Sequence, residues 1–170
     1  DIGIDEETAR ALLPRGAVDL AVASHRMGDA AMIEQLAQTD QSNMRFRDRV
    51  ALALRLRVAA IPDRESLRRA TALFALPHLA PTGATLIWGT ADAIWTALGD
   101  RSTDAGWYTK RASLSAIWAS VVLYWLGDET PEGKATQDYI DRRIDGVMRF
   151  EATKARLNAA PALRAVTAPL

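Results

Sequence analysis

Residues 105–126 read AGWYTKRASLSAIWASVVLYWL and give the clearest helix signal in the chain. Apolar side chains recur there at three- and four-residue intervals, which places Trp107, Leu114, Trp118 and Trp125 on one stripe of a helix. Residues 112–126 carry no formal charge, but this run is 15 residues long and a membrane span needs about 20. The stretch is therefore predicted to be a long helix buried in a soluble protein.

Helix-forming residues dominate on both sides of this stretch. Alanine, leucine and arginine are abundant, and proline or glycine separates the apolar-periodic segments. Asp63 stands where it would cap a helix, and Gly28 is expected to soften another helix, with Asp29 capping its restart. The fold class is predicted to be all-α, with further helices over residues 5–13, 17–38, 43–60, 63–76, 82–98 and 134–158.

One segment, residues 44–58, gives conflicting signals. Its apolar residues fall on alternate positions, which is the period of a strand. Phe46, Val50, Leu54 and Val58 are also four apart, which suits one face of a helix. The length of the segment and its alanine and arginine content favour the helix.

Composition excludes several classes of protein. The chain of 170 residues is long enough for one domain, and it has no cysteine and two histidines, His25 and His78. Disulfides, thiolate catalysis, cysteine zinc sites and multi-histidine metal sites are therefore excluded. Each histidine is interpreted as a hydrogen-bonded structural residue. No nucleophile elbow or phosphate-binding loop is present, so we expect no catalytic residue, no metal, no cofactor and no enzyme activity.

The charges are balanced overall but unevenly distributed. Lys+Arg and Asp+Glu both count 21, whereas a dedicated nucleic-acid binder usually carries a basic excess. Residues 41–69 carry eight arginines and three acids, and such a block could meet anionic lipid or phosphate. Its arginines spread around the predicted helix, so internal pairing is the favoured interpretation. We expect no nucleic-acid partner.

Tryptophan is concentrated between residues 88 and 125, which hold all five. Trp88 and Trp95 are seven apart, and Trp118 and Trp125 repeat that spacing. Two such helix faces could form an aromatic core or line an apolar pocket, and spacing alone favours the core. Asp92 lies near the first pair and would need a partner, for which Arg101 and Arg111 are candidates, either as an ion pair or to orient the polar head of a ligand.

A cluster of aromatic and charged residues opens the helix predicted over residues 105–126. Trp107, Tyr108 and Arg111 follow the polar loop 99–104 directly. Large aromatic side chains beside charges are typical of hot spots in protein interfaces. The alternative, in which Trp107 only covers the core, is equally supported.

Two stretches carry a family resemblance. Residues 90–128 read TADAIWTALGDRSTDAGWYTKRASLSAIWASVVLYWLGD, and YIDRRIDGVM follows at 139–148. Both closely resemble the ubiquinone-biosynthesis accessory family that is the ninth of the coenzyme Q series. The opening IDEETARALLPRGAVDLAVASHRMGDAAMIEQL, residues 4–36, looks like the bacterial members of that family.

The resemblance implies a TetR-like helical fold, a homodimer formed through the last long helices, and no enzyme activity of its own. It implies a lipid partner, either phospholipid, quinone or isoprenoid, bound in an apolar pocket. The second implied partner is the di-iron hydroxylase of ubiquinone biosynthesis, to which isoprenoid intermediates are presented. The patch with which members of the family face their partner falls, in this sequence, on Asp104, Trp107, Tyr108 and Arg111. The pocket falls on the helix faces that carry Trp88, Asp92, Trp95, Leu114, Ile117, Trp118, Val121 and Trp125.

The resemblance also divides the chain. Residues 1–40 are expected to be a remnant of a helix-turn-helix unit with its connecting helix, residues 41–158 the lipid-binding and dimerisation domain, and residues 159–170 a tail with prolines. The amphipathic membrane-docking helix of the family is cut off or absent here, since 13 residues follow Leu157. We expect a cytoplasmic protein, peripheral to the inner membrane of a bacterium.

The alternative function is a TetR-type repressor that senses an apolar effector. Its recognition helix would be residues 5–13. Asp5, Glu6 and Glu7 would then face the phosphate-rich groove, and Arg10 is the one basic residue of that segment. Because phosphate contacts require basic groups, the charge of the segment speaks against this function.

Overall fold

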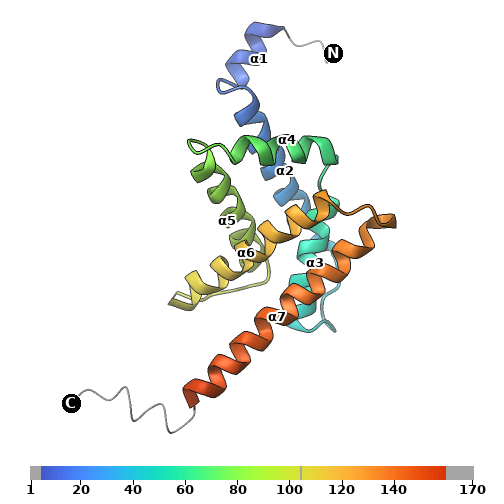
Figure 1. The fold of residues 1–170 in the computed structure, drawn as a ribbon, viewed down its shortest axis with the longest axis vertical. Coiled ribbons are helices and arrows are strands. Elements are labelled where there is room, and N and C mark those ends of the chain that lie inside the picture. Colours follow the sequence, from blue (N-terminus) through green and yellow to red (C-terminus); the bar gives the residue numbers. More distant parts are fainter. Residues whose placement is uncertain (1–4, 104, 160–170) are drawn as a thin grey trace, which may run out of the picture.

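The computed structural model describes residues 5–103 and 105–159, with side chains as far as residue 146. This part of the chain is helical throughout and contains no strand (Figure 1). Its elements are α1 Glu6–Leu12, α2 Ala17–Gln38, α3 Phe46–Ala59, α4 Arg64–Phe74, α5 Ala80–Ala97, α6 Ala105–Leu126, the 3-10 turn η1 Pro131–Gly133, and α7 Lys134–Ala159. The all-α class is confirmed, in an arrangement consistent with a TetR-like domain. Residues 160–170 of the predicted tail lie outside the described residues.

Local capping signals set several of these boundaries. The side chain of Asp5 accepts a hydrogen bond from the backbone N–H of Thr8 at 2.9 Å and begins α1. Asp63 does the same for α4 through the N–H of Ser66 at 2.8 Å, as predicted. The ambiguous segment is helical, as expected, and forms α3. Its apolar residues are needed on more than one face, because α3 packs against both α2 and α7.

The prediction that Gly28 softens α2 is wrong. The helix continues for 22 residues through this position, and Asp29 does not cap a restart. The carboxylate of Asp29 instead binds the guanidinium of Arg57 on α3, with Oδ1 2.6 Å from Nε. Gly28 is buried at the place where Arg57 crosses α2, so the absence of a side chain serves packing.

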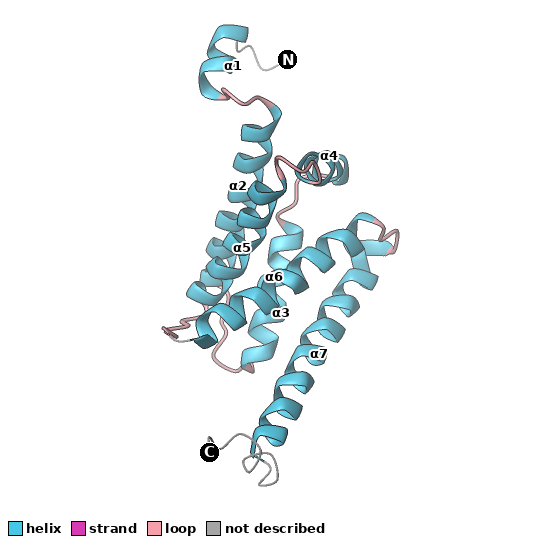
Figure 2. Ribbon diagram, turned by 60° about the vertical axis from the view of Figure 1, so that its left-hand side comes forward, coloured by secondary structure: helices cyan, strands magenta, loops and turns pink. Residues whose placement is uncertain are grey.

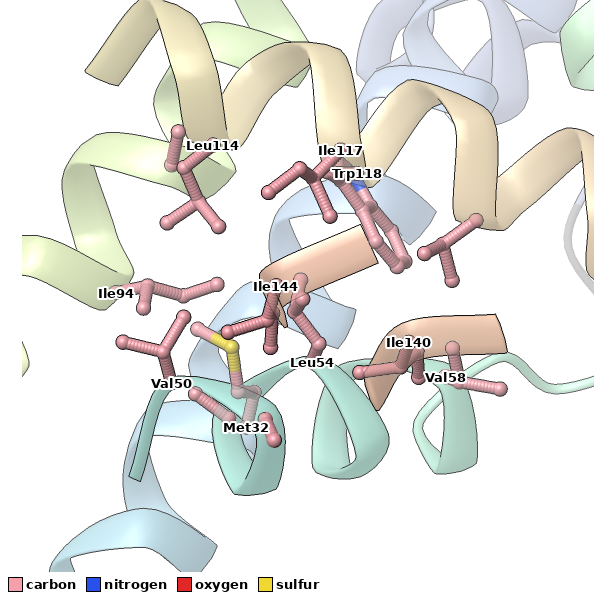
Figure 3. Close-up of a cluster of buried hydrophobic side chains, with 14 of the residues drawn as sticks. Met32, Val50, Leu54, Val58, Ile94, Leu114, Ile117, Trp118, Ile140 and Ile144 are labelled. Carbon is pink, nitrogen blue, oxygen red and sulfur yellow. The ribbon is translucent and has the colours of Figure 1, made fainter. Parts of the chain in front are cut away.

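The core is built around α6. Leu114, Ile117, Trp118 and Val121 are at most 4% exposed and belong to the same buried cluster as Ile94 of α5. Figure 3 shows Leu114 and Ile117 pointing from α6 into this cluster. The other buried apolar residues of this cluster come from α2, α3, α5, α6 and α7: Met32, Leu36, Val50, Ala51, Ala53, Leu54, Val58, Ala91, Val122, Ile140 and Ile144.

The basic block is internally paired, as favoured from the sequence. Arg57 binds Asp29, Arg55 binds Asp141 of α7, and four more arginines of the block also form ion pairs, namely Arg45, Arg47, Arg68 and Arg69. The remaining two lie over aromatic rings, with Arg49 above Phe46 and Arg64 above Trp125. The block is thus committed to folding contacts.

The position of α4 distinguishes it from the other helices. Figure 2 views α4 along its axis while α2 and α5 run lengthwise, so α4 crosses both near one end. None of its residues is buried, and it also touches α6. No helix within the described residues has the length and apolar content that crossing a membrane requires.

Candidate functional site

A cavity of about 780 Å³ lies beneath α4, between α2, α5 and α6. We call it the α4 cavity. It exists because a helix that crosses its neighbours at a steep angle contacts them over a short length and leaves space on either side. Its apolar wall combines residues of all four helices: Leu20, Leu67, Leu73, Phe74, Leu86, Ile87, Trp118, Val122 and Leu123.

The cavity opens to solvent through an apolar rim. Leu20 of α2 and Leu123 of α6 both line it and are 60% and 62% exposed. Exposed side chains of this size at the mouth of a cavity are typical of binding sites for apolar molecules. Another wall of the cavity is closed where α5 meets α4. Gly83 of α5 lies so close to α4 that a Cβ on Gly83 would stand 2.8 Å from Cβ of Phe74. This contact fixes the end of α4 against α5.

The half-buried side chain of His25 and the buried side chain of Arg57 also line the cavity. Arg57 is 4% exposed, binds Asp29, and donates from Nη2 to the carbonyl oxygen of His25 at 3.0 Å. His25 Nε2 lies 2.9 Å from Oγ1 of Thr90 and 3.2 Å from the carbonyl oxygen of Leu86. Burial, and next the charge of Arg57, hold the pKa of His25 below its ordinary value. His25 is hydrogen-bonded, as the sequence indicated.

The eight residues predicted to line a pocket do not surround one space. Trp118 is the one of them on the wall of the α4 cavity. Leu114, Ile117 and Val121 lie in the closed core instead. The spacing of apolar residues along α6 did identify its buried stripe, but the cavity wall comes from Trp118 together with Ala119, Val122 and Leu123, one step around the helix.

The other three tryptophans of that set make separate contacts. Trp88 packs against Trp107, with ring centroids 5.9 Å apart. Trp95 stacks on Phe46 at 5.4 Å, and its indole nitrogen donates to the carbonyl oxygen of Lys110 at 3.1 Å. Trp125 lies under the guanidinium of Arg64. These contacts fix α5 and α6 against their neighbours.

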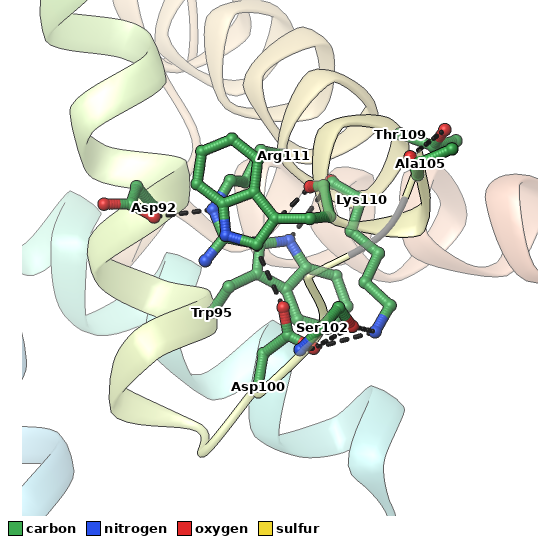
Figure 4. A network of polar contacts seen from close by, with 9 residues as sticks. Asp92, Trp95, Asp100, Ser102, Ala105, Thr109, Lys110 and Arg111 are labelled. Carbon is green, nitrogen blue, oxygen red and sulfur yellow. Dashed lines mark hydrogen bonds and ion pairs between the residues drawn. The ribbon is translucent and has the colours of Figure 1, made fainter.

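Arg111 connects helices α5 and α6 to the loop between them. Its Nε donates to Asp92 at 2.5 Å and its Nη1 to Asp100 at 3.0 Å (Figure 4). Asp92 is thus paired with Arg111, one of its two expected partners. Lys110 and Ser102 also donate to Asp100, and these donors hold the pKa of that carboxyl well below its usual range. These contacts tie the loop to the first turns of α6.

The predicted partner-facing patch is divided by burial. Tyr108 is 65% exposed and meets the edge of Trp107, with ring centroids 4.8 Å apart. Arg111 is 3% exposed and lies 4.0 Å beneath the ring of Trp107, so it supports this surface from below and does not present its own side chain. Asp104 lies outside the described residues.

The second histidine does not behave as expected. His78, predicted to be a hydrogen-bonded structural residue, lies exposed in the turn between α4 and α5. Its side chain makes no hydrogen bond to a described residue. The turn is closed instead by backbone hydrogen bonds, such as the one that Leu79 N–H donates to the carbonyl oxygen of Leu76. Across residues 5–103 and 105–146, no three acidic, histidine or cysteine side chains gather as a metal site would require.

Comparison with known proteins places this arrangement in a family. The sequence profile of the COQ9 family matches residues 80–151. "Ubiquinone biosynthesis protein COQ9, mitochondrial" of Homo sapiens is 34% identical over 123 residues, which is 71% of this chain and 38% of the human protein. The chain belongs to the COQ9 family.

Further COQ9 proteins give the same result. That of Rattus norvegicus is 33% identical over 132 residues, covering 76% of this chain and 41% of its own length. That of Drosophila melanogaster is 32% identical over 147 residues, covering 82% of this chain and 44% of its own length. The chain thus spans about two-fifths of the length of these relatives. Their names describe mitochondrial proteins of ubiquinone biosynthesis.

The network around Arg111 lies within the residues that the COQ9 profile matches, whereas part of the α4 cavity does not. The network of Asp92, Asp100, Trp107, Tyr108 and Arg111 lies wholly inside the matched residues 80–151. The α2 and α4 walls of the cavity precede them in the chain.

The α4 and α2 walls were missed by reasoning from the sequence. The signal was present in part, since Leu67, Ala70 and Phe74 recur at three- and four-residue intervals on a helix whose first two turns are otherwise polar. Such a stripe shows that one face of α4 is covered. It does not show that the covering helices stand far enough away to leave a cavity.

Proposed function

We propose that this chain is a non-enzymatic accessory protein of ubiquinone biosynthesis that holds a lipid in the α4 cavity. The lipid would be an isoprenoid, a quinone or a phospholipid, and the protein would present it to a partner hydroxylase of the di-iron class. The observation that carries the proposal is the cavity itself, about 780 Å³ in volume, mainly apolar, and open beside Leu20 and Leu123. Family membership supports the pathway.

The size and lining of the cavity suit one lipid chain. Ligand sites commonly enclose about 300–1,000 Å³ and are lined mostly by apolar side chains. Each CH₂ removed from water contributes about 0.8 kcal/mol, so a polyprenyl tail inside the cavity would be strongly stabilised outside a bilayer. Both charged side chains of this wall are paired, Arg57 with Asp29 and Arg69 with Glu65. The cavity therefore suits a container for an uncharged chain better than a centre for acid–base chemistry.

Mass spectrometry of the purified protein tests the lipid proposal. Spectra are recorded under native conditions and again after solvent extraction. We expect a co-purified or added isoprenoid at about one per chain. A protein that carries no lipid and takes up no added quinone or polyprenol would overturn the proposal.

The aromatic pair of exposed Tyr108 and half-buried Trp107 is the proposed docking surface for the hydroxylase. Tyr108 stands out from α6, and Trp107 is braced from below by Arg111. Aromatic side chains held by a rigid network are typical anchors of interfaces. Tyr108→Ala is the cleaner test, because Trp107 also packs on Trp88. Loss of hydroxylase binding in Tyr108→Ala and Trp107→Ala supports the proposal, and unchanged binding in both would overturn it.

Assembly and location are part of the same proposal. We propose a homodimer formed through α6 and α7, acting in the bacterial cytoplasm in peripheral contact with the inner membrane. A monomeric mass in light scattering at micromolar concentration would overturn the dimer. The repressor alternative gains no support from α1, where Asp5, Glu6 and Glu7 stand together and Arg10 is bound to Glu6 at 2.6 Å.

A further inference from the structure

The polar residues in the wall of the α4 cavity are not equally available to a ligand. The charge of Arg57 is paired, since Nε binds Asp29 and Nη2 binds the carbonyl oxygen of His25, while Nη1 lies over Gly28. Its guanidinium also lies 5.1 Å from the ring centroid of Trp118. A phosphate or carboxylate head would have to displace Asp29 to gain this charge. The wall therefore does not favour an anionic head.

His25 is engaged on one side of its ring. The carbonyl oxygen of Leu86 can only accept, so Nε2 must carry the proton and donate to it. Thr90 gives its own hydroxyl proton to Asp29 at 2.8 Å, so Oγ1 of Thr90 is also an acceptor for Nε2. The tautomer that satisfies both contacts carries the proton on Nε2. Nδ1 is left with a lone pair.

The lone pair of Nδ1 has no hydrogen-bond partner among the residues that the structure describes. The His25 side chain keeps 15% exposure on the cavity wall. Burial and the charge of Arg57 hold the pKa of His25 below its ordinary value, which favours the neutral ring, in which Nδ1 can accept a hydrogen bond. The surrounding wall is apolar, and a hydroxyl group brought into such surroundings needs a partner to replace water.

We propose that Nδ1 of His25 accepts a hydrogen bond from the hydroxyl group of an isoprenoid alcohol or prenylated phenol bound in the α4 cavity. The inference rests on the proposed lipid-binding function and adds the chemistry of the head group. It makes His25 the residue by which the cavity distinguishes a hydroxylated lipid from the same lipid without the O–H.

A matched pair of ligands isolates this contact. Geranylgeraniol and its methyl ether share one tail and differ in the O–H donor. Binding of each to the intact chain is measured by calorimetry at pH 7.5. We expect the alcohol to bind about threefold to tenfold more tightly than the ether, which corresponds to one net hydrogen bond.

Two variants of His25 separate the acceptor from the fold. His25→Phe and His25→Leu both remove the two ring nitrogens and introduce no other acceptor. We expect both to lose the preference for the alcohol while binding the ether as the wild type does. The Leu variant keeps the test valid if the Phe variant unfolds.

The outcomes distinguish this inference from the function on which it rests. Wild-type protein that binds alcohol and ether equally overturns the role of His25 and leaves lipid binding intact. A preference that survives in either folded variant does the same. Wild-type protein that binds neither ligand overturns the proposed function and this inference together.

Discussion

Gly28 of α2 leaves the space that the guanidinium of Arg57 fills. A Cβ at Gly28 would stand 2.5 Å from Nη1 and 2.7 Å from Cζ of Arg57. Arg57 cannot move aside cheaply, because it is 4% exposed and bound to Asp29. This one contact sets how closely α3 passes α2, and it fixes the polar residues on the wall of the α4 cavity.

Gly28→Ala is therefore expected to destabilise the protein by about 1–3 kcal/mol, although alanine is the better helix former. Gly89→Ala on α5 is the matched control. A Cβ at Gly89 meets nothing within 4 Å, so this change should stabilise the protein by about 0.5–1 kcal/mol. Urea denaturation measures both. Equal effects of the two substitutions on the free energy of unfolding would show that the position of Arg57 does not require a glycine at residue 28.

The caps of α1 and α4 offer a paired test of how α4 is held. Asp63→Ala removes the bond to the N–H of Ser66, and Asp5→Ala removes the equivalent bond to Thr8. We expect amide hydrogen exchange in the first turn of α4 to rise roughly fivefold in Asp63→Ala. Lipid should also dissociate faster from that variant, because α4 covers the cavity. Asp5→Ala should change neither quantity in α4, and a lipid off-rate that is the same in both variants would contradict the covering role of α4.

Arg111 should be far more important to stability than Tyr108, its neighbour on the same helix. Arg111→Met leaves Asp100 buried at 6% exposure with Lys110 as its remaining cation, and we expect a cost of about 2–4 kcal/mol. Arg111→Lys should also destabilise, because an ammonium cannot reach Asp92 and Asp100 in the forked geometry of a guanidinium. Tyr108→Ala, at a 65% exposed position, should stay within about 0.5 kcal/mol. Chemical denaturation gives all three values, and a fully stable Arg111→Lys would contradict this view of the network.

Asp128 gives a prediction for acid stability. Its side chain is 4% exposed and accepts hydrogen bonds from Thr130 and Thr136, both of which lower its pKa. A carboxyl whose pKa is lower in the folded state stabilises the protein above its unfolded pKa, near 4, and this contribution is lost as the pH falls further. We expect Asp128→Asn to lower Tm by about 3–6 °C at pH 7 and by progressively less below pH 4. If the difference in Tm between Asp128→Asn and the wild type is the same at pH 7 and pH 3, the charge of Asp128 does not stabilise the fold.

The limits of the helices could be predicted because they depend on local signals. Asp63 caps α4 through a residue three positions away, and the predicted span 105–126 coincides with α6. The pairing of Asp92 with Arg111 was also within reach, since charge and helix position narrowed the choice to two arginines.

The cavity could not be predicted because it depends on the angle between helices. Trp88 and Trp95 share a helix face, yet one packs on Trp107 and the other on Phe46, a residue of α3 that is 49 positions away in sequence. The burial of Arg111 likewise depends on the loop that brings Asp100 back against α6. Contacts of this kind are decided by tertiary packing, which the period of a single helix does not record.

A titration of geranylgeraniol into the wild-type chain, Ala119→Phe and Ala116→Phe tests whether the α4 cavity is the lipid site. Ala119 lines the cavity and Ala116 lies exposed on the same helix, so the two variants add the same side chain on different faces. We expect the wild type and Ala116→Phe to bind one lipid per chain with equal affinity, and Ala119→Phe to bind at least about tenfold more weakly, because its ring fills the space that the chain would occupy. Binding by Ala119→Phe with the affinity of the wild type would show that the lipid lies elsewhere.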